Sequence, residues 1–349
     1  MLKRRLQELR QRLIKEKVGA VWVSDAANIS YLSGFTNFSE TEREAYIFVG
    51  KDFAYLISDA RYTEAVKKQV SHLTLFERGH KNPTEKLLKK HEVAILGIEE
   101  NSLTVQEFKF IKKHFKKIKH FEISRSIKTK EEISNIEKAC KIGDLAFEYM
   151  LKKLRIGISE KEIANDLENF IKEKNCEFSF SPIIAFGKNS AIPHHQTGPS
   201  TLFVRSGQKG QFVLFDFGVK YENYCSDMTR TIVFGKPNEK QKKIYDAVLE
   251  AQQRAVEAIE QGERQAAKIF KAAGIDIPHS LGHGIGLQVH EHPSLSPKSK
   301  EVLKEGMVFS IEPGIYLPDF GGVRIEDLFV LEKNGLRKLT QASVKIKII

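Results

Sequence analysis

One acidic residue in the middle of an apolar run constrains the fold of this 349-residue chain more than any other feature. Asp216 lies inside the run 212–219, which otherwise predicts a buried strand. A carboxylate in that setting is costly to remove from water unless it is paired or bound to a metal. Asp227 follows a predicted hairpin turn at 220–223, and such a hairpin can bring the two carboxylates side by side. At this point a metal site and a structural role, in which each carboxylate accepts backbone hydrogen bonds, both remain open.

Three more candidate ligands lie in similar apolar segments nearer the C-terminus. His283 stands among glycines that let backbone and ligands approach its imidazole, and Glu312 and Glu326 each interrupt an apolar, strand-like run. Four carboxylates gathered without a cation would repel one another and raise their pKa values. A pair of divalent ions resolves that conflict. Oxygen-rich ligation with one imidazole favours Mn²⁺, with Co²⁺ or Zn²⁺ as alternatives.

The pattern of apolar residues predicts two domains, in line with about 150 residues per domain. Residues 1–125 alternate helix-like and strand-like segments, which is typical of a small α/β domain. In residues 126–349, Thr129 with Glu132 forms a capping-box signal that opens a long helix. Strands, turns and further helices follow, and helices flanking an antiparallel sheet give an α+β fold class.

The net charge of +11 is concentrated in the first third of the chain. Residues 1–128 hold 25 Lys and Arg against 16 Asp and Glu, a charge of +9, and the densest run is 112–119. This run fits either an anionic-surface or nucleic-acid patch or the solvated face of an amphipathic helix. The helix is favoured, because apolar residues recur at helical spacing through the same region, at Phe108, Ile111, Phe115 and Ile118. We therefore expect no nucleic-acid partner.

Two further features bear on the cellular setting. No apolar run approaches the roughly 20 residues that a membrane span needs, and the basic N-terminus lacks the apolar core of a secretory signal. The three cysteines are far apart and odd in number, which argues against a disulfide framework and a zinc finger. We expect a cytoplasmic protein with no membrane partner.

The five candidate ligands occur in the order of a known site. The order Asp216, Asp227, His283, Glu312 and Glu326 resembles the dinuclear metal site of the pita-bread metallopeptidases. Within that superfamily the chain is most similar to the Xaa-Pro peptidases, aminopeptidase P and prolidase. Their motifs are matched at 216–218, 226–230, 281–286, 289–291, 311–314 and 323–327. Segments 28–35 and 58–62 resemble the creatinase/prolidase N-terminal domain. The resemblance implies a small α/β N-terminal domain (1–125) followed by a pita-bread catalytic domain (126–349).

The resemblance also implies an activity and roles for single residues. It implies two divalent ions held by the five ligands, with Asp216 and Glu326 bridging them. Hydroxide held between the ions would attack the Xaa-Pro bond at the N-terminus of a dipeptide or short peptide. Glu312 would double as proton shuttle. The positions of the family's remaining active-site residues match His194, His290 and Arg324. Relatives commonly form dimers, so a homodimer is expected.

Several alternatives stay open at this stage. Prolidase takes Xaa-Pro dipeptides and aminopeptidase P takes longer peptides, and the motifs do not separate them. The compact chain slightly favours the dipeptidase. A peptidase of the same fold without proline specificity is a second alternative. The third is a non-catalytic pita-bread protein that binds partners or RNA, although the intact ligand set argues against it.

Overall fold

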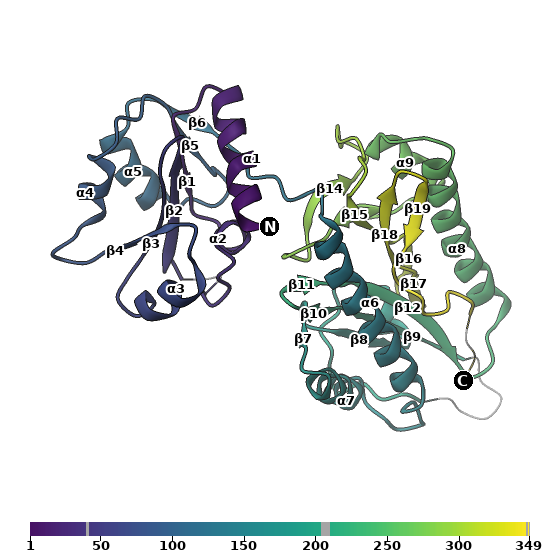
Figure 1. The fold of residues 1–349 in the computed structure, drawn as a ribbon. Coiled ribbons are helices and arrows are strands. Elements are labelled where there is room, and N and C mark those ends of the chain that lie inside the picture. The colour runs from purple at the N-terminus through teal and green to yellow at the C-terminus, as the bar shows by residue number, and fades with distance from the viewer. Residues whose placement is uncertain (40–41, 204–209, 347, 349) are drawn as a thin grey trace. The chain divides into compact units, whose positions relative to one another are not determined.

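The computed structural model describes residues 1–39, 42–203, 210–346 and 348. The chain divides into two compact units, Met1–Ser124 and Arg125–Ile349 (Figure 1). Among the described residues, no helix combines the length and the apolar character that crossing a membrane requires. The three cysteines are buried as free thiols.

The N-terminal unit is a mixed six-stranded sheet with strand order β4-β3-β2-β1-β5-β6. Helix α1 (Leu2–Lys15) is amphipathic and buries Leu6, Leu9 and Leu13 in the core of this unit. Helices and strands alternate through this unit, which confirms its α/β character: α1 (Leu2–Lys15), β1 (Ala20–Val23), α2 (Ala26–Ser33), β2 (Ala45–Gly50), β3 (Ala54–Ser58), α3 (Thr63–Gln69), β4 (Thr74–Glu77), α4 (Thr84–Leu88), β5 (Leu96–Ile98), α5 (Val105–His114) and β6 (Ile118–His120).

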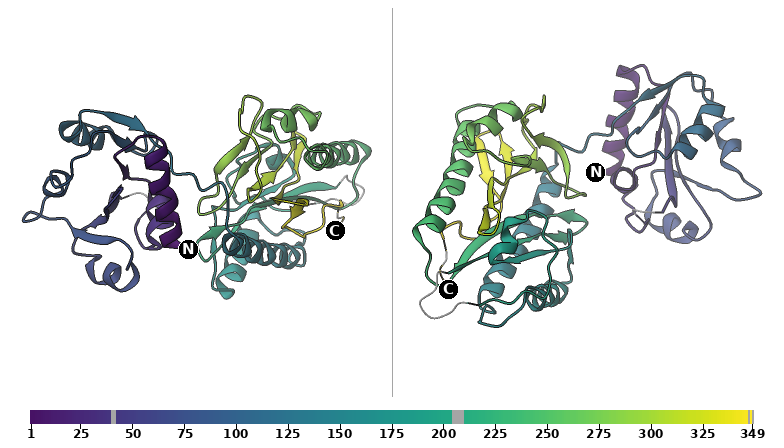
Figure 2. Two further views of the ribbon diagram at one scale, coloured as in Figure 1. Left: turned by 45° about the horizontal axis from the view of Figure 1, so that its top comes forward. Right: turned by 180° about the vertical axis from the view of Figure 1, so that it is seen from behind.

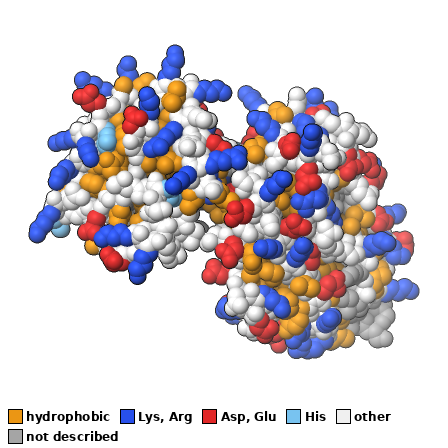
Figure 3. All heavy atoms as spheres, in the orientation of Figure 1, with side chains coloured by type: hydrophobic (Ala, Val, Ile, Leu, Met, Phe, Trp, Pro, Cys, Tyr) orange, Lys and Arg blue, Asp and Glu red, His pale blue; other side chains and the backbone are white. Residues whose placement is uncertain are grey.

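The basic run 112–119 does not lie on one helix, and that prediction is wrong. Helix α5 begins at a capping box formed by Thr104 and Glu107, but it ends at His114. The next residue, Phe115, is extended, and Ile118 enters β6, which pairs in parallel with β5. Pairing with an existing sheet edge therefore prevails over helical periodicity. Lysine and arginine side chains are spread over the visible face of this unit (Figure 3), not gathered into one patch.

The C-terminal unit combines four α-helices with thirteen short strands in its described part. Helices α6 and α8 run along the strands on different sides (Figures 1 and 2). The elements are α6 (Lys130–Leu151), α7 (Glu160–Glu173), β7 (Glu177–Phe178), β8 (Ile183–Phe186), η1 (Gly187–Ala191), β9 (Gln211–Phe217), β10 (Val219–Tyr221), β11 (Tyr224–Cys225), β12 (Met228–Phe234), α8 (Glu239–Glu260), α9 (Ala266–Ala272), β13 (Gly282–Gly284), β14 (Glu291–Leu295), β15 (Val308–Ile311), β16 (Gly314–Leu317), β17 (Gly321–Arg324), β18 (Asp327–Glu332) and β19 (Gly335–Lys338).

Two antiparallel sheets position the site. One has the order β12-β9-β8 and the other β14-β13-β15-β18-β19. The predicted hairpin turn forms at Glu222 and Asn223, both with positive φ, and in the β9–β12 ladder Thr229 lies opposite Asp216. Strand β9 is buried on both faces, because α6 packs Phe147 edge-on against Phe215 while α8 packs Tyr245 near Phe212. The charged side chains of the site are thus held by strands whose other residues form the core.

Candidate functional site

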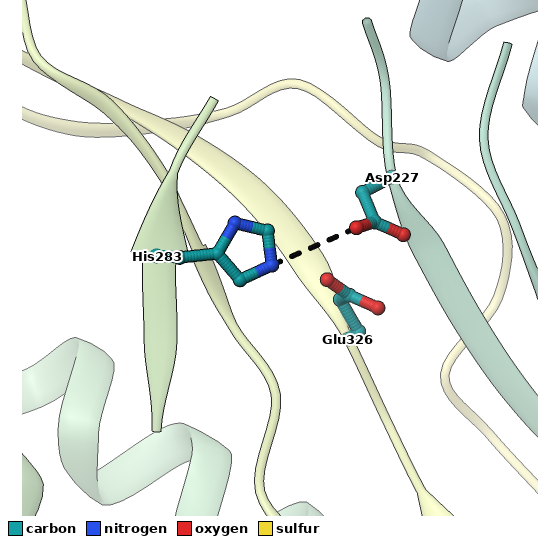
Figure 4. A group of neighbouring side chains, drawn as sticks. All are labelled: Asp227, His283 and Glu326. Atoms are coloured by element: carbon teal, nitrogen blue, oxygen red, sulfur yellow. Dashed lines mark ion pairs between the residues drawn. The ribbon is translucent and has the colours of Figure 1, made fainter. Parts of the chain in front are cut away.

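The five predicted ligands gather at strands that lie far apart in the sequence. Asp216 is in β9, Asp227 precedes β12, His283 is in β13, Glu312 follows β15 and Glu326 precedes β18. One side-chain ligand atom from each of Asp227, His283 and Glu326 lies within 4.8 Å of the other two (Figure 4). Glu312 contacts His283 of this group. Asp216 contacts Arg324, which lies beside the group.

The orientation of His283 turns one ring nitrogen, Nε2, toward two of the other candidate ligands. Its Nδ1 lies 3.1 Å from the carbonyl oxygen of Gly284, which only accepts, so Nδ1 carries the proton. Its Nε2 faces Glu312 Oε1 at 3.3 Å and Asp227 Oδ2 at 3.6 Å. Burial alone would lower the pKa of His283, but the bond to Glu312 and the surrounding carboxylates raise this pKa to about 9. The potential at Nε2 therefore strongly favours positive charge.

The glycines on either side of His283 are required by close backbone approach. A Cβ at Gly282 would lie 1.9 Å from the Ser310 carbonyl oxygen, and one at Gly284 would lie 2.1 Å from the His292 carbonyl oxygen. Strands β15 and β14 press against β13 at these two points. The close approach predicted for this motif is confirmed, and its consequence is to fix the imidazole between two strands.

Two carboxylate oxygens at the centre lack hydrogen-bond donors. Asp227 Oδ1 and Glu326 Oε1 are fully buried and have no hydrogen-bond partner among the described residues. Burial raises the pKa of both groups well above the ordinary values, and the neighbouring carboxylates raise them further. Leaving such oxygens unsatisfied is costly. A divalent cation would bind both oxygens and would also neutralise the repulsion between the carboxylates. These side chains therefore fit a metal centre.

Arg324 ties Asp216 to the rest of the site. Its Nη2 donates to Asp216 Oδ2, and its Nε donates to Thr229 Oγ1 at 3.0 Å. The Thr229 hydroxyl in turn donates to Glu326 Oε2 at 2.8 Å. Burial raises the pKa of Asp216, although the Arg324 guanidinium opposes this effect. Thr229 is not among the predicted site residues, although strand alternation from Asp227 places it on the same face and could have indicated it.

Tyr316 is a further residue that the motifs missed. Arg324 Nη1 donates to the Tyr316 hydroxyl at 2.7 Å, and the hydroxyl lies 3.0 Å from His279 Nε2. His279 Nδ1 lies 2.7 Å from the Ser280 carbonyl oxygen, so Nδ1 holds the proton and Nε2 accepts from Tyr316. Burial raises the pKa of Tyr316 to about 12, which keeps its hydroxyl protonated. Only the β16–β17 pairing brings Tyr316 near Arg324.

The two remaining predicted histidines border this centre. The ring of His290 packs edge-on to His283, with centroids 4.4 Å apart. Burial and the charge of His283 lower the pKa of His290, so its imidazole is neutral near pH 7. His194 is exposed on the segment after η1, and the carbonyl oxygen of the preceding Pro193 accepts from Arg324 Nη1 at 3.4 Å. His194 also lies close enough to His290 and His279 for its charge to act on both.

A buried ion cluster supports the His290 segment. Glu291 pairs with Arg125 at 2.9 Å and with Lys128 at 3.2 Å. The Lys128 side chain is 1% exposed and that of Glu291 is 4% exposed. Arg125 also donates to Gln288 Oε1 at 2.6 Å, so the Gln288 side chain acts as an acceptor here. The sequence showed the Val-His-Glu motif but not the two cations that hold it.

Strand-borne carboxylates, one imidazole and buried oxygens without donors together define a metal-dependent hydrolase site. A model of metallopeptidase family M24 matches residues 134–333, and one of the creatinase/prolidase N-terminal domain matches residues 5–136. The chain is 40% identical over 356 residues to a Xaa-Pro dipeptidase of Pyrococcus furiosus, covering 97% of this chain and 98% of that protein. The chain belongs to metallopeptidase family M24.

Solved structures agree in fold over the whole chain. A prolidase from Pyrococcus horikoshii has a TM-score of 0.89 at 34% identity and covers 99% of this chain and 100% of its own. An X-Pro aminopeptidase from Thermotoga maritima has a TM-score of 0.85 at 30% identity, with 99% of each chain covered. The prediction of a creatinase-type domain followed by a pita-bread catalytic domain is confirmed. The chain is a metallo-exopeptidase, and the family assignment implies divalent metal ions at its centre.

Proposed function

We propose that this exopeptidase hydrolyses the Xaa-Pro bond of dipeptides, using two divalent ions, with Mn²⁺ as the first candidate. The observation that carries the proposal is the convergence of Asp227, His283 and Glu326 around buried oxygens that lack donors. The dipeptide preference is supported by the printed names of relatives, Xaa-Pro dipeptidase and prolidase. The oxygen-rich donor set supports Mn²⁺ ahead of Co²⁺ or Zn²⁺.

We further propose that Asp216, Asp227, His283, Glu312 and Glu326 hold the ions. The sequence suggested Asp216 and Glu326 as the pair shared by both ions. Asp227 faces both His283 and Glu326, while Arg324 donates to one Asp216 oxygen; each of these carboxylates would supply oxygen ligands to the ions. When bound, the ions would act as Lewis acids and lower the pKa of water to near neutrality.

Four residues of the chain would serve the substrate. The Glu312 side chain is 15% exposed, so solvent and substrate can reach it. It faces His283, which lowers the pKa of Glu312, whereas burial raises this pKa. It is suited to take a proton from the attacking water and deliver it to the departing proline nitrogen. His290, neutral near pH 7, and His194 would donate hydrogen bonds to the scissile carbonyl as charge develops on it. Arg324 would hold Asp216 and the Pro193 backbone in place.

The proposal is tested by hydrolysis after chelation and restoration of Mn²⁺, Co²⁺ or Zn²⁺. Substrates are Gly-Pro, Ala-Pro and Met-Pro, beside Ala-Pro-Ala, Arg-Pro-Pro and Ala-Ala. Cleavage restricted to the Xaa-Pro dipeptides is expected. Cleavage of the tripeptides would identify an Xaa-Pro aminopeptidase, and equal cleavage of Ala-Ala would remove the proline specificity. Metal binding without any cleavage would favour the non-catalytic alternative.

A matched pair of variants tests the metal assignment. Glu326→Gln should lose bound metal and activity together, because it removes a buried carboxylate oxygen that would bind the metal. Glu332→Gln, at the exposed end of the adjoining strand β18, should keep both. Normal metal content and activity in Glu326→Gln would contradict the assignment. The homodimer and the cytoplasmic location stay predictions.

A further inference from the structure

A buried carboxylate outside the ligand set holds the segment that carries His194. Glu160 is the first residue of α7 and is completely buried. Its Oε1 accepts from the Phe186 backbone N–H at 2.8 Å and from Asn189 Nδ2 at 2.7 Å. Its Oε2 lies 2.9 Å from His195 Nε2 and accepts from the Gly198 backbone N–H at 3.1 Å. One carboxylate therefore gathers four groups from both sides of His194.

Backbone bonds complete the attachment of this segment to α7. The Glu160 N–H donates to the Ser200 carbonyl oxygen at 2.9 Å, and the Lys161 N–H donates to the Gly198 carbonyl oxygen at 3.0 Å. These two N–H groups belong to the first turn of the helix, where no intrahelical acceptor is available. The segment 186–200 thus caps α7, and the Glu160 side chain binds the segment in return.

His194 lies between the clamped residues and is itself exposed. Its side chain reaches the site only as accurately as the backbone that carries it. A displacement of about 1 Å in a group that orients substrate can cost roughly a hundredfold in rate. We propose that Glu160 is a positioning residue, which acts on the reaction by fixing the backbone on both sides of His194. The inference rests on the proposed function, because it takes His194 to contact the substrate.

Replacing Glu160 by glutamine tests the carboxylate itself, because the size of the side chain is unchanged. Glu160→Gln keeps the volume but turns one acceptor oxygen into a donor amide. His195 can change its tautomer to meet that amide, whereas the N–H groups of Gly198 and Phe186 cannot, so at least one backbone bond is lost. Glu162→Gln is the matched control. Glu162 lies in the same first turn of α7 and is exposed. Its side chain accepts a hydrogen bond from the backbone N–H of the N-cap residue Ser159, a role that glutamine also fills.

The first measurement compares kcat, KM and bound metal for Ala-Pro hydrolysis with Mn²⁺. We expect Glu160→Gln to lower kcat about tenfold or more, with KM changed by less than about threefold and metal content unchanged. Glu162→Gln should match the parent protein. Asn189→Ala, which removes a single donor, should lower kcat in the same direction by a smaller factor. A Glu160→Gln protein as active as Glu162→Gln would overturn the inference.

Making the same change in a protein that lacks the His194 side chain shows whether Glu160 acts through His194. In His194→Ala, the added Glu160→Gln change should alter kcat by less than about twofold, because the group being positioned is gone. An equal loss in both backgrounds would indicate a general structural role and reject the inference. Amide hydrogen exchange of segment 186–200 in the metal-free protein should rise in Glu160→Gln but not in Glu162→Gln. That readout needs no activity, so it still tests the attachment if no Xaa-Pro substrate is cleaved.

Discussion

The buried cluster around Glu291 allows a quantitative prediction for Lys128→Met. Lys128 and Glu291 lie 3.2 Å apart with almost no exposure to solvent. At an effective dielectric constant of about 20, their attraction is about 5 kcal/mol. Much of it offsets the cost of burying both charges, and breaking a buried pair by removing one partner typically costs 3–5 kcal/mol. Arg125 still faces Glu291 at 2.9 Å, so we expect the lower end, about 3 kcal/mol.

Thermal and denaturant unfolding of the metal-free protein would measure this loss. For a unit of this size, about 3 kcal/mol corresponds to a fall in Tm of roughly 6–12 °C. Lys130→Met is the control, because Lys130 is exposed two residues away and should change the free energy of unfolding by less than about 0.5 kcal/mol. Lys128→Met and Glu291→Gln combined should cost less than the sum of the single changes. If Lys128→Met unfolds within about 1 kcal/mol of Lys130→Met, the cluster does not hold the His290 segment as described.

Three further predictions concern the metal centre. Excess Mn²⁺ should raise the Tm of the parent protein and leave that of Asp227→Asn nearly unchanged; equal shifts would show that Asp227 binds no metal. The folded-state pKa of His283 is raised to about 9. The stability that its protonated ring contributes is therefore complete below pH 6.5 and is lost as pH rises through about 9. The metal-free protein should therefore lose stability over that range, as pH-dependent denaturant titrations will show, and a stability that rises with pH would contradict this. Arg324→Lys should lower kcat/KM about 10–100-fold, because lysine cannot bond Asp216, Thr229 and Tyr316 together, and an unchanged value would refute the linking role.

Much of the candidate site could be predicted from the sequence because its residues stand out against their surroundings. Asp216, Glu312 and Glu326 each interrupt an apolar run, and the glycines around His283 mark a close backbone approach that the structure confirms. The capping box at Thr129 located the start of α6. These signals are local, and each depends on the type and spacing of neighbouring residues.

The errors and omissions arose where distant segments meet. Periodicity extended a helix to Ile118, but pairing with β5 makes that residue part of a strand. Tyr316 and Glu160 have no motif, and only the β16–β17 pairing and the attachment of segment 186–200 to α7 reveal their roles. Packing also places Arg324 against Asp216 and turns Asp227 toward His283, which no local signal in the sequence indicates.

The sequence by itself determined which side chains demand compensation: acidic residues in apolar strands need a cation, and their order indicates the family. The tertiary structure decided which oxygens remain without donors, which nitrogen of His283 faces the carboxylates, and which buried carboxylate holds the segment of His194. The physical reason is one of range. Desolvation cost and helix capping are set by near neighbours in the chain, whereas hydrogen-bond and charge partners are chosen by strands and loops that meet only in the folded protein.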